Sequence, residues 1–249
     1  MPRTVIAGNW KMHKTAVQTR AFLDAFLPHV GRLPRTIDIV IAPPFTSLPE
    51  AHRILSMQSR VRLGAQTMHW ADNGAYTGEI SPPMLRELGV SYVIIGHSER
   101  RMYCNESDRT INLKTVAALA HGITPIIAVG ETLDERESGM TDARVIAQTR
   151  AALDGIAPAD LTRVIVAYEP IWAIGTGRSC DAGEADRVMG AIRGCVPALE
   201  SVSILYGGSM KGDNVAAYLA QPNINGGLVG GASLEPDAFA TLIANAVAR

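Results

Sequence analysis

Short runs rich in valine and isoleucine recur along the whole chain, and they constrain its fold more than any other feature. Continuous apolar runs of this kind are typical of parallel strands that are covered on both faces. Helical patterns lie between them, for example over 108–122 and 143–155, where Gly122 and Gly155 are expected at the helix ends. Eight runs share this character: "TVIAGNW" (4–10), "IDIVIA" (37–42), "VRLGAQ" (61–66), "SYVIIG" (91–96), "TPIIAVG" (124–130), "RVIVAYE" (163–169), "VSILYGG" (202–208) and "GGLVGG" (226–231).

Eight strand–helix units in 249 residues match the size of a closed (β/α)8 barrel. A doubly wound open sheet is the alternative, because short βα repeats alone do not separate the two architectures. No linker, low-complexity tract or block of charge divides the chain. We therefore predict an α/β fold with one domain over residues 1–249, an eight-stranded parallel barrel.

Charge and cysteine content exclude several classes of function. The net charge of −1 argues against binding to nucleic acid or to an anionic membrane surface. The first apolar run is too short for a signal peptide, and no run approaches the roughly 18 residues that span a bilayer. Cys104, Cys180 and Cys195 lack CxxC spacing and fit reduced thiols, which favours the cytoplasm. Nucleotide-binding and metal-ligand motifs do not occur, so neither a cofactor nor a metal is expected.

Chemistry in this fold class sits where strands end, so the candidate residues are those that follow the apolar runs. The first run ends "GNWKM", in which Asn9 and Lys11 point one way and Trp10 the other. Lys11 then offers a cation at the barrel mouth, although a lone lysine more often simply reaches solvent. The fourth run ends "VIIGHSERR", so His97 lies at a helix start whose positive end lowers its pKa and keeps it neutral. A half-buried structural histidine is an equal alternative there, and we expect Glu99 to form a structural ion pair.

The sixth run ends in Glu169, which opens the stretch "EPIWAIGTG" (169–177). A glutamate in such a place is more often plain surface. Here a proline and two glycines flank four apolar residues, which is the composition of a lid that is hinged at both ends. If this segment folds over the site, Glu169 loses its hydration, its pKa rises, and it becomes a general base.

The last two runs end in glycine pairs, within "YGGSMKGDN" (206–214) and "LVGGASLEPD" (228–237). Unobstructed backbone N–H groups at helix starts form an anion nest, and barrels of this class often bind phosphate after strands seven and eight. One glycine pair alone could equally make a tight turn. Together with the acid, the histidine and the lysine, the two pairs suit proton transfer beside a carbonyl on a small phosphorylated substrate.

Six segments in this order resemble the triosephosphate isomerase family: "AGNWKM", "GAYTGEISP", "IIGHSERR", "AYEPIWAIGTG", "YGGS" and "LVGGASL". The resemblance runs from about Val5 to Ala244. It implies a TIM barrel and a glycolytic and gluconeogenic enzyme. That enzyme interconverts dihydroxyacetone phosphate and D-glyceraldehyde 3-phosphate through an enediolate.

The resemblance also implies a role for individual residues. Glu169 would move the carbon-bound proton, His97 would polarise the carbonyl, and Lys11 would stabilise the enediolate together with Asn9. Residues implied to hold the phosphate are Gly175, Ser209, Gly230 and Gly231.

A homodimer is expected from the connection 66–82, which at seventeen residues far exceeds the usual 2–6. Its large apolar side chains Trp70, Tyr76 and Ile80 seek burial, and docking into a twin would supply it. The resemblance implies that the "YTGE" tip enters a pocket beside the partner's lysine. Interface residues are then Thr77, Gln66 and Tyr76, with Glu99, Arg100 and Cys104 around the pocket that receives Thr77 close to Lys11.

Three other functions stay open at this point. A relative could isomerise a four-carbon ketose phosphate with the same groups. A Schiff-base lyase or aldolase would need a lysine inside strands five to seven, but the lysines stand at positions 11, 14, 114 and 211. A non-catalytic phosphate-binding scaffold would not need the acid, the histidine and the lysine together.

Overall fold

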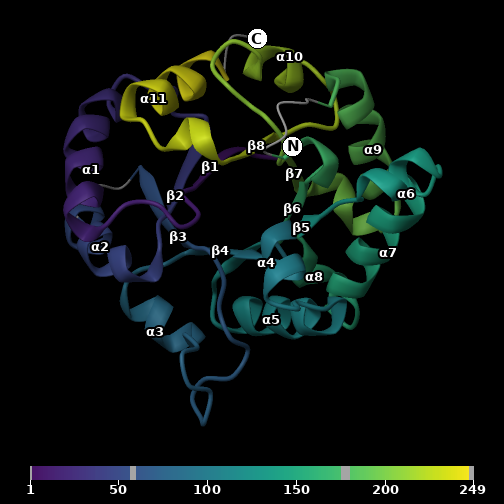
Figure 1. The fold of residues 1–249 in the computed structure, drawn as a ribbon, viewed down its shortest axis with the longest axis horizontal. Helices are drawn as coiled ribbons and strands as arrows, with labels where there is room; N and C mark the ends of the chain where they lie inside the picture. The colour runs from purple at the N-terminus through teal and green to yellow at the C-terminus, as the bar shows by residue number, and fades with distance from the viewer. Residues whose placement is uncertain (1, 57–59, 175–179, 247–249) are drawn as a thin grey trace.

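The computed structural model describes residues 2–56, 60–174 and 180–246. In these residues eight parallel strands close into a barrel in chain order, and the last strand pairs with the first (Figure 1). The strands are β1 (Thr4–Asn9), β2 (Ile37–Ala42), β3 (Val61–Ala65), β4 (Tyr92–Ile95), β5 (Thr124–Val129), β6 (Ile165–Tyr168), β7 (Ser203–Tyr206) and β8 (Gly226–Val229). The predicted (β/α)8 barrel is confirmed, and the open sheet is excluded.

Each predicted strand is present, and β2 has its predicted bounds. The other strands end one or two residues sooner than the apolar runs, because the chain turns outward there to form the loops at the barrel mouth. Closure between β1 and β8 depends on Gly226, whose φ of +146° is open to glycine. A Cβ at Gly226 would lie 1.8 Å from the carbonyl oxygen of Val5 on the neighbouring strand.

Helices surround the strands in a ring (Figure 1). The α-helices are α1 (Ala16–Val30), α2 (Leu48–Leu55), α3 (Pro82–Glu87), α4 (Ser98–Tyr103), α5 (Asp108–Ala120), α6 (Leu133–Glu137), α7 (Thr141–Leu153), α8 (Pro158–Leu161), α9 (Ala182–Gly194), α10 (Val215–Leu219) and α11 (Pro236–Asn245). Short 3-10 turns are η1 (Phe45–Ser47), η2 (Ile171–Ala173), η3 (Pro197–Ser201) and η4 (Gly231–Ser233). Gly122 and Gly155 follow α5 and α7 as predicted, one residue beyond the caps His121 and Asp154, at φ of +68° and +70°.

Apolar side chains fill both sides of the strands, which explains why the runs are continuous rather than alternating. Along β1, Val5 and Ala7 belong to a small cluster with side chains from the other strands, while Ile6 belongs to the larger cluster shared with the helices. The interior of the barrel is therefore a packed core, so a ligand can be held only at its ends.

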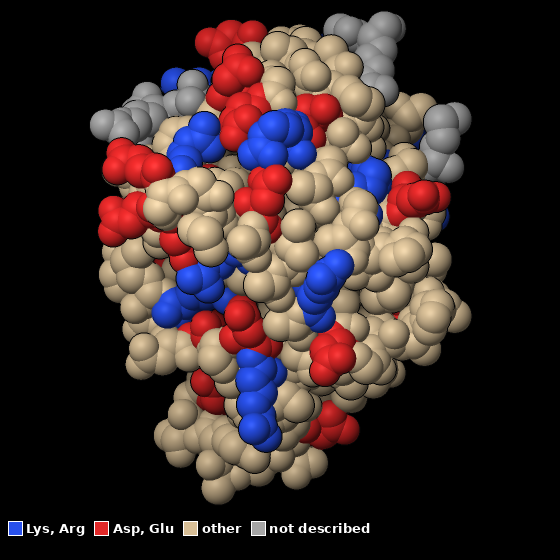
Figure 2. Space-filling model, turned by 90° about the vertical axis from the view of Figure 1, so that its right-hand side faces the viewer, with Lys and Arg blue, Asp and Glu red and all other residues tan. Residues whose placement is uncertain are grey.

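Charged side chains of both signs are mixed on the face formed by α6, α7 and α9 (Figure 2). Arg187 pairs with Asp142 at 2.9 Å, and Arg136 pairs with Glu184 at 3.2 Å. This face offers no extended basic surface. None of the described helices is both long and apolar enough to cross a membrane.

Candidate active site

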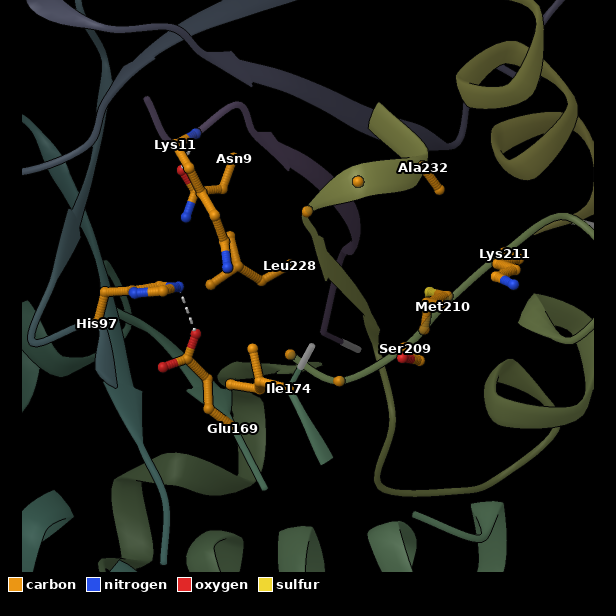
Figure 3. A pocket seen from close by; sticks show the side chains of 14 residues that line it. Asn9, Lys11, His97, Glu169, Ile174, Ser209, Met210, Lys211, Leu228 and Ala232 are labelled. Carbon is orange, nitrogen blue, oxygen red and sulfur yellow. Dashed lines mark hydrogen bonds and ion pairs between the residues drawn. The ribbon is translucent and has the colours of Figure 1, made fainter. Parts of the chain in front are cut away.

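A pocket of about 260 Å³ opens at the carboxyl end of the barrel, between the segments that follow β1, β4, β6, β7 and β8 (Figure 3). It is large enough for a small phosphorylated molecule and little more. Seven of the residues predicted from the sequence line it: Asn9, Lys11, His97, Glu169, Ser209, Gly230 and Gly231. Predicted Gly175 lies outside the described residues.

Lys11 follows β1 and holds a left-handed backbone conformation with φ of +51°. Two neighbours support this strained residue: its N–H donates to Asn9 Oδ1 at 3.0 Å, and its carbonyl accepts from Gln66 Nε2 at 2.8 Å. Its ammonium lies 2.6 Å from Glu99 Oε1, which confirms the predicted structural ion pair of Glu99. The same Gln66 amide also donates to the carbonyl of Ala42 at 2.9 Å, and the predicted place of Gln66 at a subunit interface stays a prediction.

His97 caps the N-terminus of α4, as the sequence predicts for a histidine at a helix start. Its Nδ1 accepts the backbone N–H of Glu99 at 3.2 Å, so the proton of the neutral ring resides on Nε2. Nε2 faces Glu169 Oε1 at 3.0 Å (Figure 3). The imidazole can therefore donate a proton or a hydrogen bond into the pocket.

Glu169 follows β6 and is 2 % exposed. Its second oxygen, Oε2, accepts the backbone N–H of Ser98 at 3.0 Å. Two glycines of neighbouring strand ends leave room for it: a Cβ at Gly130 would lie 1.8 Å from the Glu169 carbonyl oxygen, and one at Gly207 would lie 2.7 Å from its Cγ. Sequence reasoning missed Gly130 and Gly207, although a glycine directly after a buried strand was a visible signal.

The ionisation of the pair differs from the sequence-based prediction. Burial alone raises the pKa of Glu169, but His97, the Ser98 amide and Lys11 outweigh burial and hold that pKa below its ordinary value. Burial likewise lowers the pKa of His97, and Glu169 reverses this and raises it. Both predicted directions are wrong for this arrangement, because the sequence does not show that the two groups face each other at 3.0 Å.

This pairing gives a pH-dependent contribution to the free energy of unfolding. The contribution of His97, whose pKa is raised, is complete below its ordinary value of 6.5 and is lost as the pH rises through the folded pKa. The contribution of Glu169, whose pKa is lowered, is present above its ordinary value of 4.5 and is lost as the pH falls through the folded pKa. The pair therefore stabilises the ligand-free protein most between pH 4.5 and 6.5.

We expect the difference in Tm between wild type and His97→Gln to be largest in that window and to shrink on both sides. Melting curves from pH 4 to 9 measure it. His52→Gln, in α2, is the matched control, since His52 makes no ion pair among the described residues. An effect of His97→Gln that does not change with pH would show that the pair does not exist in solution.

The apolar segment after Glu169 is anchored at its start. Trp172 Nε1 donates to Glu131 Oε1 at 2.8 Å, and the guanidinium of Arg136 lies 4.5 Å from the centre of the Trp172 ring system. Ile174, at the end of this described part, lines the pocket. The predicted lid role depends on residues 175–177, which lie outside the described residues, and stays a prediction.

The segments after β7 and β8 complete the opposite side of the pocket. Gly230 and Gly231 begin the turn η4, where the first N–H groups of a helix have no partner within it and can bind an anion. A Cβ at Gly230 would lie 3.6 Å from Lys11 Cε, so this nest lies beside the lysine. Ser209 lies on the neighbouring segment after β7. The arrangement can hold a phosphate next to a cation and an acid–histidine pair.

The predicted interface loop, coloured blue in Figure 1, projects beyond the ring of helices. Trp70 and Ile80 already pack against the core of their own chain, so they do not require a partner for burial. Tyr76 packs against His69 with ring centres 4.1 Å apart and stays 47 % exposed, and Thr77 is exposed. The burial argument for a partner therefore rests on Tyr76 and Thr77 at the tip of the loop, and the interface stays a prediction.

In the described residues, no group of three or more His, Cys, Asp or Glu side chains is arranged so that it could hold a metal ion. The chemical groups that the pocket does bring together are a carboxylate, an imidazole, an ammonium and backbone N–H donors. Such a set at the mouth of a (β/α)8 barrel defines an acid–base enzyme for a small anionic substrate.

Comparison of the sequence with known proteins shows to which family of acid–base enzymes the chain belongs. A family model described as "Triosephosphate isomerase" matches residues 4–246. A triosephosphate isomerase of Trichodesmium erythraeum is 49% identical over 243 residues, covering 98% of this chain and 99% of the relative. Another, from Picosynechococcus, is 51% identical over 243 residues with the same coverage, and one from Caldanaerobacter subterraneus is 47% identical over 249 residues, covering 98% and 99%. The chain belongs to the triosephosphate isomerase family, and its function is the isomerisation of triose phosphate in glycolysis.

Proposed function

We propose that Glu169 is the base that moves a proton between neighbouring carbons of dihydroxyacetone phosphate and D-glyceraldehyde 3-phosphate. The observation that carries this assignment is the carboxylate itself, 2 % exposed and directed into the pocket 3.0 Å from His97. A carboxylate whose pKa is low is ionised at neutral pH, and it becomes a stronger base once the attraction of His97, which lowers that pKa, is removed.

Catalysis requires the pair to separate. A substrate carbonyl oxygen near His97 would take over the Nε2–H that now points at Glu169, and this exchange would free the carboxylate to face the reacting carbon. With Glu169 no longer beside it, the imidazole loses the attraction that raises its pKa and acts as a neutral donor. Proton removal places negative charge on the enediolate oxygens, which Lys11 and Asn9 are positioned to stabilise.

The phosphate of the substrate would bind at the nest formed by Ser209, Gly230 and Gly231. Support for Gly175 as a fourth ligand comes from the family resemblance alone. Titration with 2-phosphoglycolate and with glycolate tests the site, since both carry a planar carboxylate like the enediolate and only one carries phosphate. Competitive binding of phosphoglycolate alone is expected, and equal binding of both would remove the phosphate site from this account.

A homodimer is supported by exposed apolar side chains beside the pocket. Met12 is 94%, Tyr103 75% and Met102 59% exposed, which is costly for side chains of this size. The ion pair of Lys11 with Glu99 joins the segment after β1 to α4, so Met12 and the two residues of α4 lie in one region. We infer that a second copy covers it with the projecting tip that carries Thr77, which would reach the partner's Lys11.

Thr77→Arg should dissociate the dimer and lower kcat by about tenfold or more, because a bulky cation at the contact would repel the lysine that it supports. Mass in solution and turnover are measured on the same sample. Thr36→Arg is the matched control, an exposed threonine where β2 begins, and it should leave both unchanged. A fully active, dimeric Thr77→Arg protein would show that the tip is not the interface.

The cytoplasm is the proposed location. All three cysteines are free thiols, as is usual in a reducing compartment. Cell fractionation tests it, and recovery of the enzyme outside the cytoplasm would overturn it.

A further inference from the structure

We propose that Lys211 is a further substrate-binding residue, a cation that draws the phosphate dianion into the pocket and holds it there. This assignment of Lys211 rests on the proposed phosphate site and adds one residue to that site. Lys211 lines the pocket together with Ser209 and Gly231. Figure 3 shows Lys211 on the same segment as Ser209 and Met210, across the pocket from Glu169 and His97.

The charges around the pocket indicate that Lys211 is the cation available to attract the phosphate. Among the described lining residues, only Lys11 and Lys211 carry a permanent positive charge. Glu99 lies 2.6 Å from the Lys11 ammonium and offsets much of its field. Lys211 forms no ion pair among the described residues, and this includes Asp213, two positions further on. A phosphate dianion entering the pocket therefore meets one cation that is not already neutralised.

The backbone of Lys211 is held in a defined turn. The N–H of Lys211 donates to Asn214 Oδ1 at 2.8 Å, and Nδ2 of the same asparagine donates to the carbonyl of Ser209 at 3.1 Å. From α11, Asn245 Nδ2 donates to the carbonyl of Gly212 at 2.7 Å. One amide thus links the cation to the proposed phosphate ligand Ser209, so both are presented together at the pocket rim.

The expected effect of replacing Lys211 is set by how exposed its side chain is to solvent. The Lys211 side chain is exposed, so water and salt screen its charge, and an exposed charge pair changes affinity only modestly. For Lys211→Met we expect KM and the inhibition constant of phosphoglycolate to rise about two- to fivefold at low ionic strength. The rise should vanish in about 0.5 M salt, where the screening length is only a few ångströms. The value of kcat should not change, because the reacting carbons lie at the other side of the pocket.

The experiment measures both constants for wild type, Lys211→Met, Lys211→Arg and Arg32→Gln at about 0.02 and 0.5 M salt. Lys211→Arg keeps the charge and should match wild type. Arg32→Gln removes one positive charge after α1, away from the pocket, and should also match it. Equal constants for wild type and Lys211→Met at low salt would overturn the role of Lys211. A wild type that binds no phosphoglycolate would instead overturn the phosphate site on which the inference rests.

Discussion

Replacement of Glu169 by glutamine should lower kcat by about 10³- to 10⁴-fold while the barrel stays folded. Glutamine has nearly the same shape and its oxygen can still accept the Ser98 amide, so the variant removes the base and, with it, the pairing of this side chain with His97. Its amide cannot take up a carbon-bound proton at neutral pH. Turnover is measured in a coupled assay on glyceraldehyde 3-phosphate, with circular dichroism to verify the fold.

Glu137→Gln supplies the control for this substitution. Glu137 ends α6 on the surface, outside the pocket lining, and its loss should leave kcat within about twofold of wild type. If Glu169→Gln retains a tenth of the wild-type rate, another group must act as the base.

Lys11→Met should lower kcat/KM by about 10²- to 10³-fold, because it removes the ammonium that we propose stabilises the enediolate. Methionine keeps an unbranched chain of similar length, so the loss reports the charge. The variant also leaves Glu99 without its partner, and the unpaired carboxylate repels the anionic substrate.

Lys14→Met provides a closely matched control. Lys14 is three positions away, also holds a left-handed backbone with φ of +72°, and directs its ammonium over the rings of Trp10 and Phe22 instead of the pocket. Lys14→Met therefore also places a methionine at a backbone position with positive φ, but it changes no residue of the pocket. Equal losses in the two variants would mean that the strained loop, and not the charge of Lys11, supports catalysis.

The order of elements could be predicted from the sequence because each strand is a local apolar run of visible length. β2 was predicted with its bounds, and the others differ by one or two residues where glycine or polar residues leave the ladder. The closed ring was predicted from the number of runs and the chain length, but not the pairing that closes it, which joins Val5 to Gly226 from opposite ends of the chain.

Strand ends likewise identified Lys11, His97 and Glu169, because all chemistry in this fold gathers at one end of the barrel. Their mutual orientation was not predictable. The ion pair of His97 with Glu169 depends on side-chain directions that tertiary packing sets, and it reverses the expected pKa shifts. Gln66 shows the same limit, since its contact with the Lys11 carbonyl joins residues 55 positions apart.

Isomerisation in D2O tests the central claim, that a protein base moves the proton through an enediolate. Glyceraldehyde 3-phosphate is converted by the wild-type enzyme, and the dihydroxyacetone phosphate formed is analysed by proton NMR for deuterium on C1. Glu169 removes the proton from C2, and the protonated carboxyl group can exchange with solvent before it delivers a proton to C1. We predict solvent-derived deuterium on C1, at a rate that falls with turnover in Glu169→Gln. A product that carries no deuterium at all would contradict this account, in which the proton resides on a carboxyl group that exchanges with solvent.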